Sequence, residues 1–144
     1  MPSSDLELKK STLQLIQDMS VAEKMDLARK GSKEERTILM RDANRLVQLA
    51  VVQSPKITDA EVLQIAGNRQ VDDDALRFIA SKKEWLKNYQ VTVALTTNPK
   101  TPLAIALKLV GSLRARDLEH LTRSKGVPRA LAVAARQRLL TTKK

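Results

Sequence analysis

Residues Gln90–Gly111 read QVTVALTTNPKTPLAIALKLVG, in which two apolar segments are joined by the corner Asn98-Pro99-Lys100-Thr101-Pro102. A related stretch lies 44 positions earlier, because Leu46–Gly67 reads LVQLAVVQSPKITDAEVLQIAG and aligns without a gap. A segment that recurs at a fixed period of this size indicates a helical repeat, in which each copy is one supersecondary unit. The aligned pairs include Pro55 with Pro99, Lys56 with Lys100, Leu63 with Leu107 and Gly67 with Gly111.

The composition favours an all-α fold. The chain has 144 residues and 42% hydrophobic content, which suit a single domain with its own core. Only 2% of the residues are aromatic, so aliphatic side chains must build that core, and these favour close-packed helices over a sandwich or a barrel. We expect one helical-repeat domain over residues 20–140, an N-terminal tail over residues 1–19 that is partly helical, and a frayed tail over residues 141–144.

Several classes of site are disfavoured by residues that the chain lacks. It has no cysteine and one histidine, so it offers no disulfide, no thiolate metal site and no multi-histidine metal centre. The first residues lack the continuous apolar segment of a secretory signal. The most apolar stretch, Leu103–Val110, is far shorter than the roughly 20 residues that span a bilayer. We therefore expect a soluble, cytoplasmic, bacterial-type protein without a cofactor.

Capping residues predict where the helices of the first half begin and end. Capping boxes start at Ser20, Ser32 and Thr58, each followed three residues later by a glutamate that satisfies a free backbone N–H of the first turn. Asp42 is expected to cap a helix that runs through Val52, where the following proline disfavours helical geometry. The predicted helix stops are Gly31, Gly67 and Gly111.

The corner of the second copy is expected to lie between two helices. Trp85, Tyr89 and Val93 follow each other at i, i+4 and i+8, which indicates one continuous helix leading into the corner. Alternation over residues 91–95 is also compatible with a strand, but the matching segment at residues 46–52 has a helical stripe, so we expect a helix.

The remaining helices are predicted from their apolar stripes. Leu103–Val110 is apolar nearly all round and is expected to be the most buried helix. A short helix follows at Asp117–Arg123, and Pro128 suits the first turn of the last helix. The inner stripe of that last helix is predicted to be Leu131, Ala134, Ala135 and Leu139.

The corner and its flanking helices resemble the leucine-rich repeat variant and other HEAT-like α-solenoids. Asn98-Pro99-Lys100-Thr101-Pro102 matches the Asn-Pro-x-Thr-Pro corner of that family in full, Ser54-Pro55-Lys56-Ile57-Thr58 in part, and Gly126-Val127-Pro128 less well. The resemblance covers roughly Arg41–Leu140 and implies a short right-handed α-solenoid of eight or nine stacked helices that binds a partner. Part of the family binds an iron–sulfur centre through cysteines, and this chain has no cysteine.

Three groups of residues are candidates for chemistry, and each has a simpler structural explanation. His120 has no identifiable nucleophile or second base near it in the sequence, which favours an ordinary surface histidine. The Asp72–Asp74 cluster offers oxygen ligands to a cation, but it lacks the glycine and distal glutamate of a calcium loop, and helix capping explains it. Trp85 and Tyr89 lie among lysines, which is compatible either with stacking on single-stranded nucleic acid or with packing between repeats.

Positive charge is concentrated in the C-terminal part of the chain. The net charge is +10, and from Lys100 onward there are eleven bases and two acids. Arg116 and Arg123 are seven positions apart on one predicted helix. Arg129 and Arg136 have the same spacing on the next helix, so two helices can present one basic face to phosphates or to an acidic protein. The alternative is a solvated face that aids solubility. The candidate binding residues are Arg114, Arg116, Arg123, Lys125, Arg129, Arg136 and Arg138.

These observations predict a non-enzymatic interaction module. No paired carboxylates, nucleophile with a base, or metal-ligand spacing can be identified, so no catalytic residue and no metal ligand is predicted. The expected partner is a protein, for which an acidic surface would be complementary. The alternative is binding of a DNA or RNA backbone through the basic C-terminal face. No membrane partner and no small-molecule substrate are expected.

Overall fold

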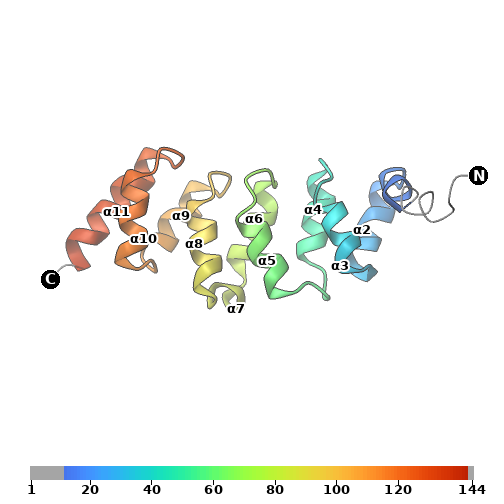
Figure 1. The fold of residues 1–144 in the computed structure, drawn as a ribbon, viewed down its shortest axis with the longest axis horizontal. Helices are drawn as coiled ribbons and strands as arrows, with labels where there is room; N and C mark the ends of the chain where they lie inside the picture. The colour runs from blue at the N-terminus through green and yellow to red at the C-terminus, as the bar shows by residue number, and fades with distance from the viewer. Residues whose placement is uncertain (1–11, 143–144) are drawn as a thin grey trace, which may run out of the picture. The chain divides into compact units, whose positions relative to one another are not determined.

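The computed structural model describes residues 12–142, and all regular secondary structure in that range is helical (Figure 1). The all-α prediction is therefore confirmed. The chain divides into two compact units, Met1–Ile57 and Thr58–Lys144, and the boundary falls inside the first copy of the repeat. None of the helices in residues 12–142 is long and apolar enough to cross a lipid bilayer.

Unit 1 is a group of short helices joined by tight turns. They are a helix at residues 12–17, α2 (Val21–Lys30), α3 (Lys33–Leu39) and α4 (Arg45–Val52). The predicted capping boxes at Ser20 and Ser32 begin α2 and α3, with both hydrogen bonds of each box present. Helix α2 packs against both α3 and α4, and Ala28 and Val47 are fully buried between them. The rest of the predicted N-terminal tail, residues 1–11, lies outside the described range.

Helix α4 begins later than predicted, because Asn44 and not Asp42 is its N-cap. The Asn44 side chain accepts hydrogen bonds from the backbone N–H groups of Leu46 and Val47. Asp42 instead accepts a hydrogen bond from the Asn44 N–H and pairs with Lys24 of α2 at 2.5 Å. Burial acts to raise the pKa of the Asp42 carboxyl, but the hydrogen bonds from Lys24 and Asn44 outweigh burial and lower that pKa. The ion pair therefore joins the turn before α4 to α2.

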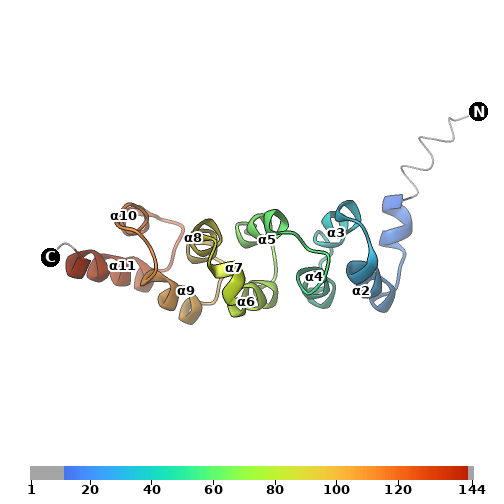
Figure 2. The ribbon, with the colours of Figure 1, turned by 90° about the horizontal axis from the view of Figure 1, so that it is seen from below.

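Unit 2 consists of two rows of helices. Its helices are α5 (Asp59–Ala66), α6 (Asp73–Ser81), α7 (Lys83–Leu86), α8 (Tyr89–Thr97), α9 (Leu103–Val110), α10 (Ala115–Arg123) and α11 (Arg129–Thr142). Figure 2 shows α5, α8 and α10 in one row and α6, α9 and α11 in the other. Helices that follow each other pack together, α8 with α9 and α10 with α11, while α5 packs against α8 within its own row. The strand alternative at residues 91–95 is wrong, since this segment is part of α8.

The two copies of the repeat have closely similar helix positions and share much of their burial pattern. Shifting α5 by 44 positions gives the bounds of α9, and both helices end at a glycine C-cap. Eight aligned pairs are buried in both copies, which indicates that each copy turns the same faces inward. These pairs are Val47/Val91, Gln48/Thr92, Val51/Leu95, Val52/Thr96, Ser54/Asn98, Val62/Ala106, Ile65/Leu109 and Ala66/Val110.

The similarity continues beyond the glycine caps with an offset of 42 positions. Adding 42 to the residue numbers that bound α6 gives those that bound α10. It also aligns Leu76 with Leu118 and Ile79 with Leu121, and all four side chains are 0% exposed. The predicted correspondence of these leucine and isoleucine positions is confirmed.

Asn98 holds the corner of the second copy through three hydrogen bonds. Its side chain is 5% exposed, and its Oδ1 accepts a hydrogen bond from the backbone N–H of Lys100 at 2.9 Å. Its Nδ2 donates to the carbonyl oxygens of Ala66 at 2.8 Å and Asn68 at 2.9 Å. Those carbonyls lie at the end of α5, so Asn98 joins the C-terminal ends of α8 and α5. Pro99 is exposed, and Pro102 is the N-cap residue of α9.

The hydrogen bond between the Asn98 side chain and the backbone N–H two residues later has counterparts at other turns. In each case a short polar side chain accepts a hydrogen bond from the backbone N–H two residues later, which is the turn that Asn, Asp and Ser side chains favour. The recurring pairs are Asp42 with Asn44, Ser54 with Lys56, Asn68 with Gln70, Asn98 with Lys100 and Ser124 with Gly126.

The prediction that Trp85 and Tyr89 lie on one continuous helix is wrong. Helix α7 ends at Leu86, and Asn88 begins α8 by accepting a hydrogen bond from the Gln90 N–H at 3.1 Å. An asparagine side chain that bonds to its own backbone competes with helix continuation, which explains the break.

Helix α9 is not the most buried helix, contrary to expectation. Leu103 and Leu107 are 39% and 38% exposed, and Ala106, Leu109 and Val110 form its buried side. Helix α11 also extends past the predicted end of the domain at residue 140, to Thr142, while residues 143–144 lie outside the described range.

The core at the C-terminal end of unit 2 joins α9, α10 and α11. Leu131, Ala135 and Leu139 of α11 are buried in it, and Ala134 packs against it, so the predicted inner stripe of the last helix is confirmed. Leu118 and Leu121 of α10 belong to the same cluster. The opposite sides of α10 and α11 are therefore available to solvent.

Candidate functional site

The outer side of α10 carries a basic row. Arg116, His120 and Arg123 follow each other at i, i+4 and i+7, are all exposed, and lie opposite the buried Leu118 and Leu121. Within residues 12–142, no carboxylate forms an ion pair with Arg116 or Arg123. We call these three residues the α10 ridge.

The outer side of α11 combines positive charge with apolar side chains. Arg129, Val133, Arg136 and Leu140 follow each other at i, i+4, i+7 and i+11, which places them along one side of the helix. The arginines are exposed, as are Val133 at 40% and Leu140 at 66%. The sequence of α11 contains no acidic residue, so the helix does not neutralise its own charge. We call these four residues the α11 ridge.

Arg114 is exposed but contacts Tyr89 through both its backbone and its side chain. The Tyr89 hydroxyl accepts a hydrogen bond from the Arg114 backbone N–H at 2.8 Å and donates one to the Asp117 carboxylate at 2.5 Å. The Arg114 guanidinium lies 4.2 Å from the centre of the Tyr89 ring, a cation–π distance. Tyr89 also packs against the C-terminal core. Tyr89 therefore links α8 to the start of α10, and we assign it and Arg114 a structural role.

Arg138 also contacts the fold, whereas the other predicted basic residues are available for a partner. The Arg138 guanidinium donates to the Gly111 carbonyl at 3.3 Å, at the C-terminal end of α9, where a cation is favourable. Lys125 is exposed in the loop between α10 and α11. That Arg116, Arg123, Lys125, Arg129 and Arg136 form one continuous basic face stays a prediction.

Tyr89 is the only tyrosine, so its ionisation can be measured directly. Burial raises the pKa of its phenol, the hydrogen bond to Asp117 raises it further, and the Arg114 N–H acts in the opposite direction. The protonated phenol then stabilises the fold fully below the unfolded pKa of about 10. This contribution is lost as the pH rises through the folded pKa.

We expect the ultraviolet absorbance of tyrosinate to appear at higher pH in the folded chain than in the urea-unfolded chain. Asp117→Asn removes the negative charge beside the phenol and is expected to move the folded midpoint back toward the unfolded one. Identical midpoints for the folded wild type and the folded variant would contradict the interaction between Tyr89 and Asp117.

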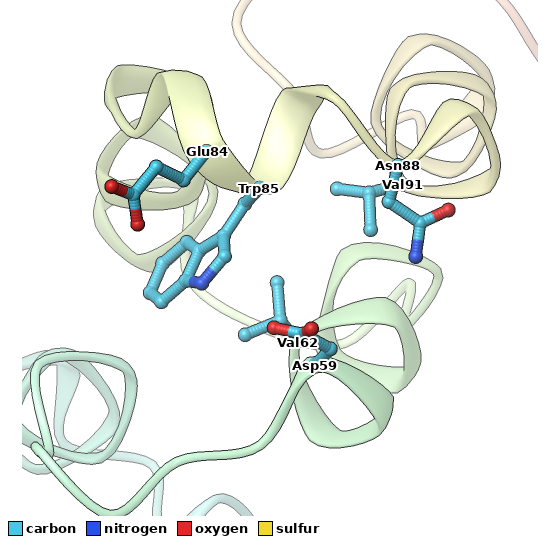
Figure 3. Close-up of a pocket in the computed structure, with 6 residues that line it drawn as sticks. All are labelled: Asp59, Val62, Glu84, Trp85, Asn88 and Val91. Carbon is cyan, nitrogen blue, oxygen red and sulfur yellow. The ribbon is translucent and has the colours of Figure 1, made fainter.

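Trp85 contacts the fold and lines a small pocket. Its ring meets the Phe78 ring edge-on, with centroids 6.0 Å apart, and Lys82 Nζ lies 5.0 Å from the centre of the Phe78 ring. Figure 3 shows the indole extending from α7 toward Val62 of α5. The pocket has a volume of about 30 Å³, comparable to one water molecule, whereas ligand pockets start at about 300 Å³. Its lining residues are Asp59, Val62, Glu84, Trp85, Asn88 and Val91.

Within residues 12–142, each unit also has a wider hollow. The hollow in unit 2 has about 420 Å³ and is lined by the five consecutive residues Ser81–Trp85. The hollow in unit 1 has about 300 Å³ and lies between the helix at residues 12–17 and the end of α3, with Asp42 at its edge. In the hollow of unit 2 the Ser81 hydroxyl donates to the Phe78 carbonyl at 2.6 Å and not to a base.

The other predicted candidates are explained by helix structure. His120 is exposed and has Arg116 and Arg123 as its neighbours on the α10 ridge. The carboxylates of Asp72, Asp73 and Asp74 lie within 4.8 Å of one another at the start of α6. Asp72 is the N-cap, accepting from the Asp74 N–H at 2.9 Å, and Asp73 pairs with Arg77 at 3.5 Å. Capping and the helix dipole account for this cluster.

Arg129 and Arg136 of the α11 ridge are predicted from the sequence, but Val133 and Leu140 are not. The signal in the sequence is the alternation of arginine with an apolar residue at spacings of four, three and four. An apolar residue of a helix is by default assigned to the core, which hides this signal.

Comparisons with protein families, with characterised proteins and with solved structures find no significant match to this chain. The resemblance to HEAT-like repeats therefore rests on the residues of the corner and on the repeated helix pattern.

Proposed function

We propose that the chain is a short right-handed α-solenoid of the HEAT-like class that acts as a non-enzymatic module and binds a protein partner. The repeat proposal is supported by the matching helix bounds and burial of the two copies. Helical repeats of this kind bury their apolar faces by stacking and leave extended surfaces for partners. The proposed binding surface lies on helices α9 and α11.

One observation carries the proposal of a protein partner: α9 and α11 both expose large apolar side chains. Leu103 and Leu107 are one turn apart on α9, and Val133 and Leu140 lie on the outer side of α11. Single exposed leucines are common, but two pairs on helices that pack together are not explained by the core. Protein interfaces combine apolar contacts with arginine, which matches this surface.

Affinity capture from a lysate of the native cell tests this function. The tagged chain is expected to retain a protein at a fixed stoichiometry after nuclease treatment of the lysate. A variant with serine at Leu103, Leu107, Val133 and Leu140 is expected to lose it, because all four side chains are exposed and their replacement leaves the core unchanged. Fluorescence of the single tryptophan, Trp85, confirms that the variant folds. Absence of any retained protein, or equal retention by both chains, would contradict the proposal.

A second candidate function is binding of the phosphate backbone of a nucleic acid through the α10 ridge. It is favoured because Arg116 and Arg123 form no ion pair with a carboxylate within residues 12–142. In that case affinity for duplex DNA falls with salt, with a logarithmic slope of about −0.9 for each phosphate contacted. A gel-shift titration at two salt concentrations separates the candidates. Binding that weakens with salt and is lost in the variant Arg116→Glu/Arg123→Glu supports nucleic acid. No shift of duplex or single strand at low salt removes this candidate.

A further inference from the structure

We infer that the α11 ridge is the docking site for an acidic amphipathic helix of the partner protein. This inference rests on the proposed function and names the chemistry of the partner. The ridge residues Arg129, Val133, Arg136 and Leu140 are spaced by four, three and four positions. This is the spacing with which one helix presents side chains to another helix lying along it. Helix α11 has 14 residues and is about 21 Å long, enough for a partner of comparable length.

The ridge is separate from the face that α11 uses in its own fold. Leu131, Ala135 and Leu139 occupy the inner side and are at most 8% exposed. Val133 and Leu140 are 40% and 66% exposed, so both side chains are accessible on the outer side of the helix. The amphipathic pattern of a solvated helix would place polar residues there. The apolar half of the docking site is therefore already present on the folded helix.

The positive charge of the α11 ridge determines which kind of partner helix it can bind. Arg129 and Arg136 alternate with the two apolar residues, and α11 carries no acidic residue that could pair with them. A second copy of this chain would bring four ridge arginines and no acid of α11 together, and the two chains would each carry a net charge of +10. A partner with glutamates beside its leucines would instead pair each arginine while covering Val133 and Leu140. The phosphates of duplex DNA would pair with the two arginines. They would also lie against Val133 and Leu140, which are apolar and gain nothing from that contact.

The test uses the whole chain and a labelled peptide of about three heptads, with leucine at a and d and glutamate at e and g. We expect saturable binding in fluorescence anisotropy. The same peptide with lysine in place of glutamate is expected not to bind. Equal binding of the two peptides would overturn the inference, as would no binding of the acidic one.

Matched variants locate the site. Arg129→Glu/Arg136→Glu is expected to weaken binding at least tenfold. Arg116→Glu/Arg123→Glu makes the same charge change at the same spacing on the α10 ridge and is expected to have less than a threefold effect. Equal losses would mean general charge attraction and would overturn the inference. For the apolar half, Val133→Ser/Leu140→Ser is expected to weaken binding. Leu13→Ser/Leu15→Ser, which changes two leucines of similar exposure in unit 1, serves as its control.

Competition distinguishes the other partners that a basic ridge attracts. Duplex DNA and vesicles of anionic phosphatidylglycerol are added to the bound peptide. Displacement that depends on the arginines but not on Val133 and Leu140 would overturn the inference in favour of phosphate binding. If the captured native partner depends on the exposed apolar residues but not on Arg129 and Arg136, the proposed function stands and the acidic-helix inference fails.

Discussion

Replacing Asn98 with alanine is expected to destabilise unit 2 by about 2–4 kcal/mol, because the variant loses three hydrogen bonds of a buried side chain. Two of these bonds reach the carbonyls of Ala66 and Asn68 at 2.8 and 2.9 Å, and the buried Ala66 carbonyl lies at the end of α5. Alanine leaves both acceptors without this donor and also removes the turn to Lys100. Urea unfolding followed by fluorescence of the only tryptophan, Trp85, measures the loss within unit 2.

Two further variants separate the contributions to this corner. Asn98→Ser copies the residue of the first copy, where the Ser54 hydroxyl accepts from the Lys56 N–H at 3.3 Å. It keeps the local turn but is too short to reach α5, so it should cost less than alanine while remaining destabilising. Pro99→Ala changes an exposed residue and should cost least, about 0.4–1 kcal/mol, through the greater freedom of the unfolded chain. Equal stability of Asn98→Ala and wild type would contradict the role of Asn98.

Replacing Gly31 with alanine is expected to destabilise unit 1 by about 1–3 kcal/mol, the usual cost of forcing extra atoms into a packed site. A Cβ at this position would lie 2.6 Å from the Leu27 carbonyl oxygen and 2.9 Å from Glu35 Oε1. The first atom belongs to the backbone of α2, and the second accepts the Ser32 N–H in the capping box of α3. Relief of either contact therefore disturbs the end of one helix or the start of the next.

Gly67→Ala is the matched control, because Gly67 is also a helix C-cap but a Cβ there meets nothing closer than 3.8 Å. It should be neutral or slightly stabilising. Amide hydrogen exchange of Ala28 and Val47 reports on unit 1, which contains none of the three aromatic residues. Unchanged protection of these amides in Gly31→Ala would show that the backbone moves away at little cost.

Helix starts and the repeat were predictable because they depend on residues close in sequence. Ser20, Ser32 and Thr58 each form the capping box that their spacing with glutamate predicts. The 44-residue repeat also identified α8 as helical where its own apolar pattern was ambiguous. Gly31 ends α2 as predicted. Its φ is −78°, so close contact and not left-handed geometry requires glycine.

The failures concern contacts between elements that are distant in sequence. The apolar sequence of α9 does not reveal that Leu103 and Leu107 are exposed. In the same way, Arg114 is recruited by Tyr89 and Arg138 by Gly111, positions 25 and 27 residues away. Charge counting cannot separate such arginines from those that remain available. The burial of a side chain depends on the neighbouring helices, and the sequence of one helix does not specify what those neighbours are.

Chemical-shift mapping of the isotope-labelled whole chain, titrated with the acidic heptad peptide, can locate the docking site residue by residue. We expect the largest backbone shift changes at Arg129, Val133, Arg136 and Leu140, on the outer side of α11. Changes of equal size at Arg116 and Arg123 of the α10 ridge, or none on α11 at saturation, would contradict this expectation.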